Sequence, residues 1–352
     1  MSYKDGWAAM NLEMPRRIPR SEFDAECHWE LVKAVTGIPV SVESPGDLKQ
    51  KARLAFIRAW NYDVVFGCLI GHGELDACRT NMGHAVYAAG GIDYDADIRC
   101  PFKTPEEVLA FDPWAVYGPR DKAGLTRRFN EHYRRQCEAH PTAVNMTGIY
   151  VSCISGLIAI FGWDLLLTAT GLDPEGFGEV TNRYATWVRQ YYEALADSEA
   201  PVIYSHDDIV WTSGAIFRPE WYRRYVFPNL RRHYEPLVAR GKKIIFVSDG
   251  DYTEFVDDIA ACGVAGFFFE PLTDLRVLAE RYGKTHVLIG NVDTRVLLSG
   301  SKVRIRAEVE RCVATGRSCP GYFIGVTNMI PANTPVWAAL YYNEVYERLS
   351  RR

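Results

Sequence analysis

Residues 243–292 decide the fold, and they read KIIFVSDGDYTEFVDDIAACGVAGFFFEPLTDLRVLAERYGKTHVLIGNV. Three short apolar runs, at 243–248, 265–270 and 287–292, alternate here with two segments that have the apolar spacing of amphipathic helices. Such alternation is typical of parallel strands joined by right-handed helical connections. The sequence therefore predicts an α/β protein with a parallel sheet.

The same rhythm extends outward from this stretch to four further strands, at 63–70, 143–151, 201–209 and 321–326. We therefore predict a (β/α)₈ TIM barrel, and we expect the missing eighth strand within residues 83–100. The alternative is an open, doubly wound sheet. It is disfavoured because no GxGxxG motif follows any of the seven strands.

Residues 1–45 are irregular, rich in Pro and Arg, and contain no strand-like run. We interpret them as an N-terminal extension packed on the barrel, and residues 46–352 as a single barrel domain. The loop-rich segment 71–125 is long enough to suggest a lid or a docking surface.

The composition excludes some partners. The net charge is −4, and charged residues make up 24% of the chain, so there is no basic excess to attract nucleic acid or an anionic membrane. No apolar run approaches the roughly 18 residues that span a bilayer, and residues 1–20 lack a signal-like apolar core. We expect a cytoplasmic protein.

Polar residues gather at the ends of the predicted strands, which is where the chemistry of an α/β barrel takes place. They include Cys68, His72, Tyr150, His206, Asp207, Asp249, Glu270, Asn291 and Asn328. Asp251 and Asp293 are equally well explained as caps of the following helices. Asp207 and Asp208 are adjacent on a strand, so at most one of them should enter the barrel mouth.

Several carboxylates converging on one mouth would repel each other when ionised. A raised pKa, a cationic partner such as Arg20, or a divalent metal would relieve that repulsion. The residues alone leave the choice among the three open.

Three stretches resemble the uroporphyrinogen decarboxylase superfamily in order and spacing. They are DDIVWTSGAIFRPEWYRRYVFPNLRRHYEPLVARGKKIIFVSDGD at 207–251, GNVDTRVLLSG at 290–300 and PGYFIGVTNMIPANTP at 320–335. The resemblance implies one of two activities. One is cofactor-free decarboxylation of a tetrapyrrole, and the other is zinc-dependent methyl transfer between a corrinoid protein and an acceptor.

The chain departs from the decarboxylase pattern at three places. It has no RQAGR segment near the N-terminus, and Phe66-Gly67-Cys68 stands where that family has FSD. The family also has a histidine late in the chain. The matching position here lies near Thr327-Asn328, where there is no histidine. Porphyrinogen decarboxylation is therefore not expected.

The chain also departs from the thiol-type methyltransferases, whose zinc is held by His-x-Cys. That position reads Val247-Ser248-Asp249 here, and the late cysteine is missing. Any zinc would need harder ligands, for which Asp249, Glu270 and His206 are the candidates.

We accordingly predict an enzyme on the methyltransferase side of the superfamily. It would move a methyl group between a small O- or N-methyl compound and a corrinoid (cobalamin) supplied by a partner protein, as in a demethylase. Its candidate catalytic residues are Asp249, Glu270, Asp207 and His206, and its candidate substrate-binding residues are Tyr150, His72, Asn291, Asn328 and Cys68.

Two alternatives stay open. One is a metal-independent decarboxylase or lyase that acts on a small acid and uses Arg20 or Arg79. The other is a barrel that has kept the fold and lost the chemistry.

Overall fold

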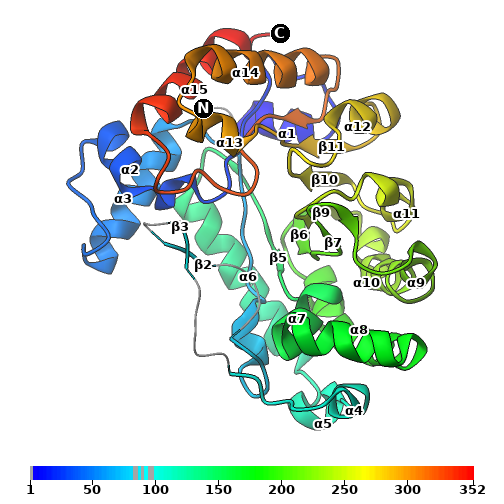
Figure 1. Cartoon of the computed structure of the whole chain (residues 1–352). Coiled ribbons are helices and arrows are strands. Elements are labelled where there is room, and N and C mark those ends of the chain that lie inside the picture. Colours follow the sequence, from blue (N-terminus) through cyan, green and yellow to red (C-terminus); the bar gives the residue numbers. More distant parts are fainter. Residues whose placement is uncertain (1–2, 82–85, 89–90, 94–98) are drawn as a thin grey trace.

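The computed structural model describes residues 3–81, 86–88, 91–93 and 99–352. Its parallel strands stand in chain order around the molecule, with helices outside them (Figure 1). The strands are β1 (Val64–Val65), β4 (Val144–Asn145), β5 (Thr147–Ile149), β6 (Val202–His206), β9 (Lys243–Ser248), β10 (Gly266–Phe269), β11 (Val287–Ile289) and β12 (Tyr322–Phe323). All seven predicted strand regions are therefore confirmed, with 143–151 divided between β4 and β5.

The strands pair in parallel through two sets of contacts. β1 pairs with β4, while β5, β6, β9, β10, β11 and β12 form one continuous sheet in that order. The strands are short but almost entirely apolar and buried, as expected for a parallel sheet covered on both faces.

The place between β12 and β1 is taken by residues 19–21. The nitrogen of Ile324 donates to the carbonyl of Pro19 at 2.9 Å, and the nitrogen of Ser21 donates to the carbonyl of Ile324 at 3.1 Å. On the other side, the nitrogen of Asp63 donates to the carbonyl of Arg20 at 2.9 Å. This short segment thus serves as the eighth strand.

The predicted position of the eighth strand, within 83–100, was wrong for the residues that the structure describes. There β2 (Val86–Ala88) and β3 (Gly91–Asp93) form an antiparallel pair apart from the parallel strands. Residues 82–85, 89–90 and 94–98 lie outside the described residues. The division into an extension at 1–45 and a barrel at 46–352 stays a prediction, although residues 19–21 belong to the ring of strands.

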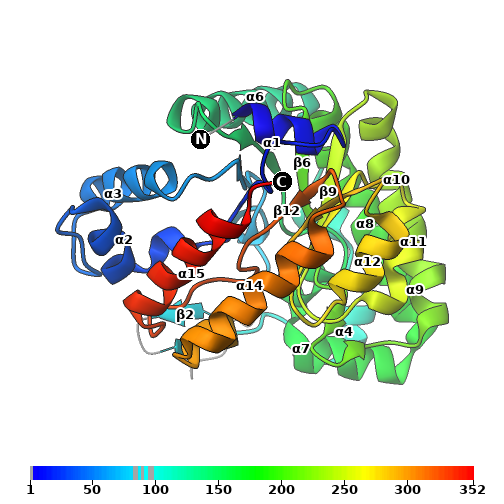
Figure 2. The same ribbon diagram turned by 90° about the horizontal axis from the view of Figure 1, so that it is seen from above.

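The helices cover the outside of the strands, and the pair α14 and α15 lies side by side in both views (Figures 1 and 2). In chain order the α-helices are α1 (Tyr3–Met10), α2 (Trp29–Thr36), α3 (Gly46–Ala59), α4 (Pro105–Leu109), α5 (Pro113–Tyr117), α6 (Lys122–Ala139), α7 (Ile154–Leu172), α8 (Pro174–Ala196), α9 (Pro219–Tyr225), α10 (Phe227–Ala239), α11 (Val256–Ala260), α12 (Leu275–Tyr282), α13 (Thr294–Leu298), α14 (Lys302–Gly316) and α15 (Val336–Leu349). Three short 3₁₀ helices are η1 (Ala25–Cys27), η2 (His72–Leu75) and η3 (Thr253–Phe255), and a small hairpin joins β7 (Val210–Trp211) to β8 (Gly214–Ala215).

The barrel interior has its own apolar core, separate from the larger core between strands and helices. Ala9 and Met10 of α1 belong to that interior core together with Val64, Val144 and Val202, which lie at or near the amino ends of their strands. Because α1 fills this end, the opposite end of the barrel is left for a binding site.

The helix α7 is long and apolar enough, by length and composition, to span a membrane, contrary to the sequence-based expectation. However, 67% of its apolar window is buried inside the protein, and Gly162 interrupts it with a φ of 71°. Both features are typical of a helix that belongs to a protein core, so α7 is weak evidence for a membrane segment.

Candidate functional site

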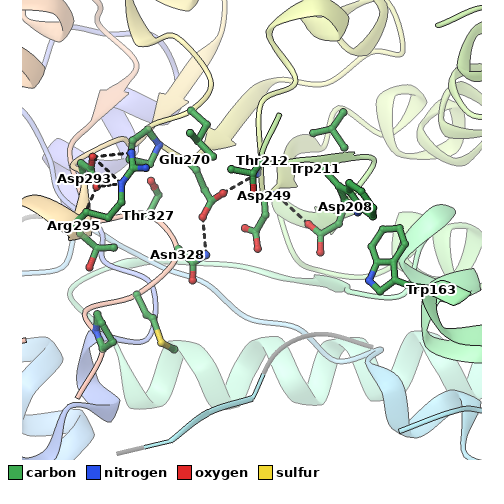
Figure 3. A pocket seen from close by; sticks show the side chains of 17 residues that line it. Trp163, Asp208, Trp211, Thr212, Asp249, Glu270, Asp293, Arg295, Thr327 and Asn328 are labelled. Carbon is green, nitrogen blue, oxygen red and sulfur yellow. Dashed lines mark hydrogen bonds and ion pairs between the residues drawn. The ribbon is translucent and has the colours of Figure 1, made fainter. Parts of the chain in front are cut away.

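A cavity of about 480 Å³ opens at the carboxyl ends of the strands, and we call it the mouth cavity (Figure 3). It is lined mainly by residues that directly follow strands, with two tryptophans at one side. The lining residues include Asp208, Asp249, Gly250, Glu270, Asp293, Arg295, Asn328, Trp163 and Trp211.

The two aspartates after β6 face different surroundings. Asp207 is fully buried, and its Oδ1 accepts a hydrogen bond of 2.8 Å from the nitrogen of Ser155 at the start of α7. Asp208 lines the mouth cavity instead. As predicted, only one of the pair enters the mouth, but that residue is Asp208, and Asp207 helps to cap α7.

Asp208 is paired with His206. The Nε2 of His206 lies 3.1 Å from Oδ1 of Asp208, and its Nδ1 lies 3.0 Å from the carbonyl of Tyr150. Burial lowers the pKa of His206, but the charge and hydrogen bond of Asp208 outweigh it and raise the pKa to about 9. The imidazole also stacks on the Tyr150 ring, with the ring centroids 3.8 Å apart, which fixes its orientation. The raised pKa favours the cationic form of His206.

Glu270, directly after β10, is fixed by two neutral donors. The nitrogen of Gly250 donates to its Oε2 at 2.7 Å, and Nδ2 of Asn328 donates to its Oε1 at 2.6 Å. Gly250 has a φ of 78°, and a Cβ there would lie 2.5 Å from the carbonyl oxygen of Trp211, so only glycine suits this position. Asn328 itself has a φ of 85°.

Asp249, directly after β9, points its carboxylate into the mouth cavity between Asp208 and Glu270 (Figure 3). Within the described parts of the chain, no group donates a hydrogen bond to this carboxylate. Burial, the charge of Asp208 and the charge of Glu270 together raise the pKa of Asp249 well above its ordinary value. The surroundings of Asp249 therefore favour its protonated form unless a cation lies beside it.

A smaller inner cavity of about 180 Å³ lies deeper in the barrel and shares Asp249 and Asn328 with the mouth cavity. It is also lined by His206, Tyr150 and Asp24. Burial raises the pKa of the Asp24 carboxyl, which comes from the N-terminal segment. The inner cavity connects Tyr150 and His206 with the mouth.

Cys68 and His72 lie farther away, around a third pocket that they share with Tyr150. The His72 ring meets the Tyr150 ring edge-on at 5.2 Å, and Sγ of Cys68 donates to the carbonyl of Ile70 at 3.3 Å. Tyr150 therefore lines both the inner cavity and this third pocket. Cys68 and His72 do not line the mouth cavity.

Asn291 serves the backbone rather than the mouth. It is buried, its Nδ2 donates to the carbonyl of Thr273 at 3.0 Å, and its Oδ1 accepts from Arg311 at 3.1 Å. Asp293 accepts from the nitrogen of Arg295 at 2.8 Å and caps α13, as the simpler interpretation predicted.

The described residues fit a metal poorly, because none of their His, Cys, Asp and Glu side chains form a group of three suited to holding an ion. His206 and Asp208 are engaged with each other, and both Glu270 oxygens accept hydrogen bonds. The tentative zinc ligands Asp249, Glu270 and His206 therefore do not come together as a ligand set.

Sequence reasoning missed Trp163, Trp211 and Arg295, which all line the mouth cavity. Trp211 follows β6 by five residues and Arg295 follows β11 by six, so both lie in the βα connections where barrel sites are built. Trp163 lies on α7 immediately after the interruption at Gly162, a place that the helical pattern did not mark.

These features define an α/β barrel with a carboxylate-lined site at the carboxyl ends of its strands. A family model described as uroporphyrinogen decarboxylase (URO-D) matches residues 121–345, which is more than half of the chain. The chain belongs to the URO-D family, and the resemblance seen in the sequence is confirmed.

Two known proteins illustrate the relationship. A uroporphyrinogen decarboxylase of Pelobacter propionicus is 24% identical over 178 residues, a match that spans 51% of this chain and 51% of that protein. The matched region is thus about half the length of that curated relative. A methyltransferase from Methanosarcina mazei shares the fold with a TM-score of 0.64 over 99% of both chains, at 16% identity.

Proposed function

We propose that this protein is a methyltransferase of the URO-D family that moves a methyl group between a small O- or N-methyl compound and a corrinoid presented by a partner protein. The observation that carries the proposal is the position of the Asp249 carboxyl, which projects into the mouth cavity. No group in the described parts of the chain donates a hydrogen bond to it. The shared fold with a methyltransferase supports it.

The chemistry of demethylation asks for one of two things at the leaving atom. When a methyl–oxygen bond breaks, the oxygen keeps the electron pair and must gain a proton. When a methyl–nitrogen bond of a quaternary ammonium breaks, the nitrogen leaves neutral and needs no proton. Asp249 suits both cases, as a protonated acid beside oxygen or as a carboxylate beside a cation.

Neighbouring residues would keep Asp249 in place. Its backbone nitrogen donates to Oδ1 of Asp208 at 3.0 Å, and Asp208 is in turn held by the His206 cation. On the other side Glu270 is fixed by Gly250 and Asn328. The acid would thus stand between two rigid neighbours, which favours a defined position for the reacting methyl group.

The size of the mouth cavity fits a small substrate but not a corrinoid. A volume of about 480 Å³ is in the range of small-molecule sites. The corrinoid would therefore be presented at the rim, where it supplies the nucleophilic centre that accepts the methyl group, or the methyl group to be donated. The described carboxylates do not form a ligand set for zinc, so the proposed transfer relies on the Asp249 carboxyl.

The lyase alternative has weaker support because its cations lie elsewhere. Arg20 is fully buried and paired with Glu22 at 2.9 Å, and Arg79 is paired with Asp76 at 2.6 Å. Arg295, the one arginine among the described residues that line the mouth cavity, is engaged by Asp293. A small acid would find few counter-ions in this site.

The test is methyl transfer by the purified chain to free reduced cobalamin, followed by the change in its absorption spectrum, with tetramethylammonium, choline and 2-methoxyphenol as donors. Asp249→Asn should lower the rate by about 100-fold or more. Asp251→Asn is the matched control, because Asp251 accepts from Thr253 and does not line the cavity. Equal rates for Asp249→Asn and the unaltered protein would contradict the proposal.

Elemental analysis separates the metal-free acid from a zinc site. One zinc per chain, lost in both Asp249→Ala and Glu270→Ala, would show that these carboxylates hold a metal and would overturn the acid role given to Asp249.

A further inference from the structure

Two tryptophans form one wall of the mouth cavity. Trp163 lies on α7 and Trp211 on the β7–β8 hairpin, and their ring centroids are 5.5 Å apart with an angle of 66° between the planes. Trp211 is 47% exposed to solvent, although it is a large apolar residue. A rim that exposes tryptophan beside a cavity is typical of a surface that meets a ligand.

The mouth cavity is lined by more carboxyl groups than cationic groups. The guanidinium of Arg295 contacts both carboxylate oxygens of Asp293, at 2.9 and 3.1 Å from Nε, so this pair neutralises itself. Asp208 is matched by His206. Asp249 and Glu270 form no ion pair with any residue of the described ranges, so the cavity offers two carboxyl groups that no described cation matches.

We infer that the mouth cavity binds the cationic, N-methylated class of substrate, with a quaternary ammonium group set between the Trp163–Trp211 wall and the carboxylates of Asp208 and Asp249. This inference rests on the proposed function and narrows it from O- or N-methyl compounds to methylated ammonium ions. Tryptophan faces attract such cations through the ring quadrupole, and methylation removes the N–H donors that would otherwise need hydrogen-bond partners.

A neutral methyl ether would make poorer use of this site. It would leave the Glu270 carboxylate without a counter-charge and would gain little from the tryptophan wall beyond apolar contact. The cationic substrate satisfies both features at once, since one group meets the rings and the carboxylates together.

The corresponding transfer balances without a proton donor. The bond between one methyl carbon and the nitrogen breaks, and its electron pair stays on the nitrogen, which leaves as a neutral tertiary amine. The methyl carbon forms its new bond to the nucleophilic corrinoid acceptor. In this reaction Asp249 acts as an ionised carboxylate that holds the substrate cation.

The test compares the binding of choline with that of its uncharged isostere, 3,3-dimethylbutan-1-ol, to the purified full-length chain by calorimetry. We expect choline to bind at least tenfold more tightly. Trp163→Leu and Trp211→Leu should each weaken choline binding by about tenfold and leave the weak binding of the isostere unchanged.

Trp114→Leu is the matched control, because Trp114 is 39% exposed on α5 and does not line the cavity. Thermal unfolding of all three variants separates lost binding from lost folding. Equal binding of the two isosteres, or choline binding that survives both cavity variants, would overturn the inference.

The outcome is distinguishable from that of the proposed function, since binding needs no turnover. Selective choline binding without methyl transfer from any amine would support the substrate class and count against the methyltransferase. Transfer from 2-methoxyphenol with no preference for choline would keep the methyltransferase and overturn the substrate class.

Discussion

The Oδ1 atom of Asp208 accepts a hydrogen bond of 3.0 Å from the backbone nitrogen of Asp249, which ties the end of β6 to the end of β9. The same oxygen lies 3.1 Å from Nε2 of His206. One buried carboxylate thus orients the candidate acid and holds a histidine cation. The protonation state of His206 should therefore be a sensitive probe of this arrangement.

The first prediction concerns the titration of His206. Its pKa is raised to about 9, so nuclear magnetic resonance should find it charged at pH 7.5. Asp208→Asn removes the main stabilising charge and should lower the pKa substantially, because burial disfavours the cation and Asp249 and the Tyr150 carbonyl are the weaker opposing influences. A histidine that is neutral at pH 7.5 in the unaltered protein would contradict the pairing.

The second prediction follows from linkage at the same residue. The folded pKa exceeds the unfolded one, so the His206–Asp208 pair stabilises the fold fully below pH 6.5 and loses that effect as the pH rises through about 9. The loss amounts to roughly 3 kcal/mol of unfolding free energy. Urea unfolding at pH 6 and pH 9.5 should show this difference, and His206→Gln should reduce it.

A third prediction concerns Asp207, whose pKa burial raises to about 7. Because the folded pKa is the higher one, the folded state favours the protonated acid, and stability is lost as the pH rises from about 4 through 7. Asp207→Asn keeps an acceptor for the Ser155 nitrogen and carries no charge, so its urea unfolding free energy should fall less over that range. An unchanged slope would show that Asp207 is ionised without cost.

A fourth prediction concerns the buried pair Arg20 and Glu22. Both side chains are fully buried, and Oε1 of Glu22 also accepts from the Tyr342 hydroxyl at 2.8 Å. Arg20→Met would leave the Glu22 carboxylate without its cation and should cost about 3–5 kcal/mol of unfolding free energy. Arg306→Met is the control, because the Arg306–Glu310 pair is exposed and should contribute less than about 1 kcal/mol.

The fifth prediction uses two glycines in the left-handed region. Gly241 has a φ of 68° with open space around it, whereas a Cβ on Gly250 would meet the Trp211 carbonyl at 2.5 Å. Gly241→Ala should cost about 1 kcal/mol, while Gly250→Ala should cost clearly more and also displace the donor to Glu270. Thermal unfolding of the two variants gives the comparison, and equal costs would show that the backbone at Gly250 relaxes easily.

The sequence predicted the strands well because each of them is a short, buried apolar run. It missed residues 19–21 because Pro19 and Arg20 do not look like a strand. The burial of Arg20 depends on the nearby Glu22 and on Trp60 and Asn343, which are distant in the chain. A buried charged residue is explained only when its partners are known.

For the site, the rule that chemistry follows strand ends pointed to Asp249, Glu270, His206 and Asn328. The first two and Asn328 line the mouth cavity and His206 lines the inner cavity, while their catalytic and binding roles stay predictions. It could not decide between Asp207 and Asp208, because one residue of register reverses which side chain faces the mouth. It also passed over Trp163 and Trp211, since aromatic residues in apolar stretches usually belong to the core.

The pairing of residues 19–21 with Ile324 places the joint of the ring between segments about 300 residues apart in the chain. During synthesis the first of these segments is made long before its partner. Until then its backbone polar groups and the Arg20 charge are hydrated or bound by a chaperone. The ring can close only after the last strand has been made, and pairings between segments so far apart in the chain favour slow folding.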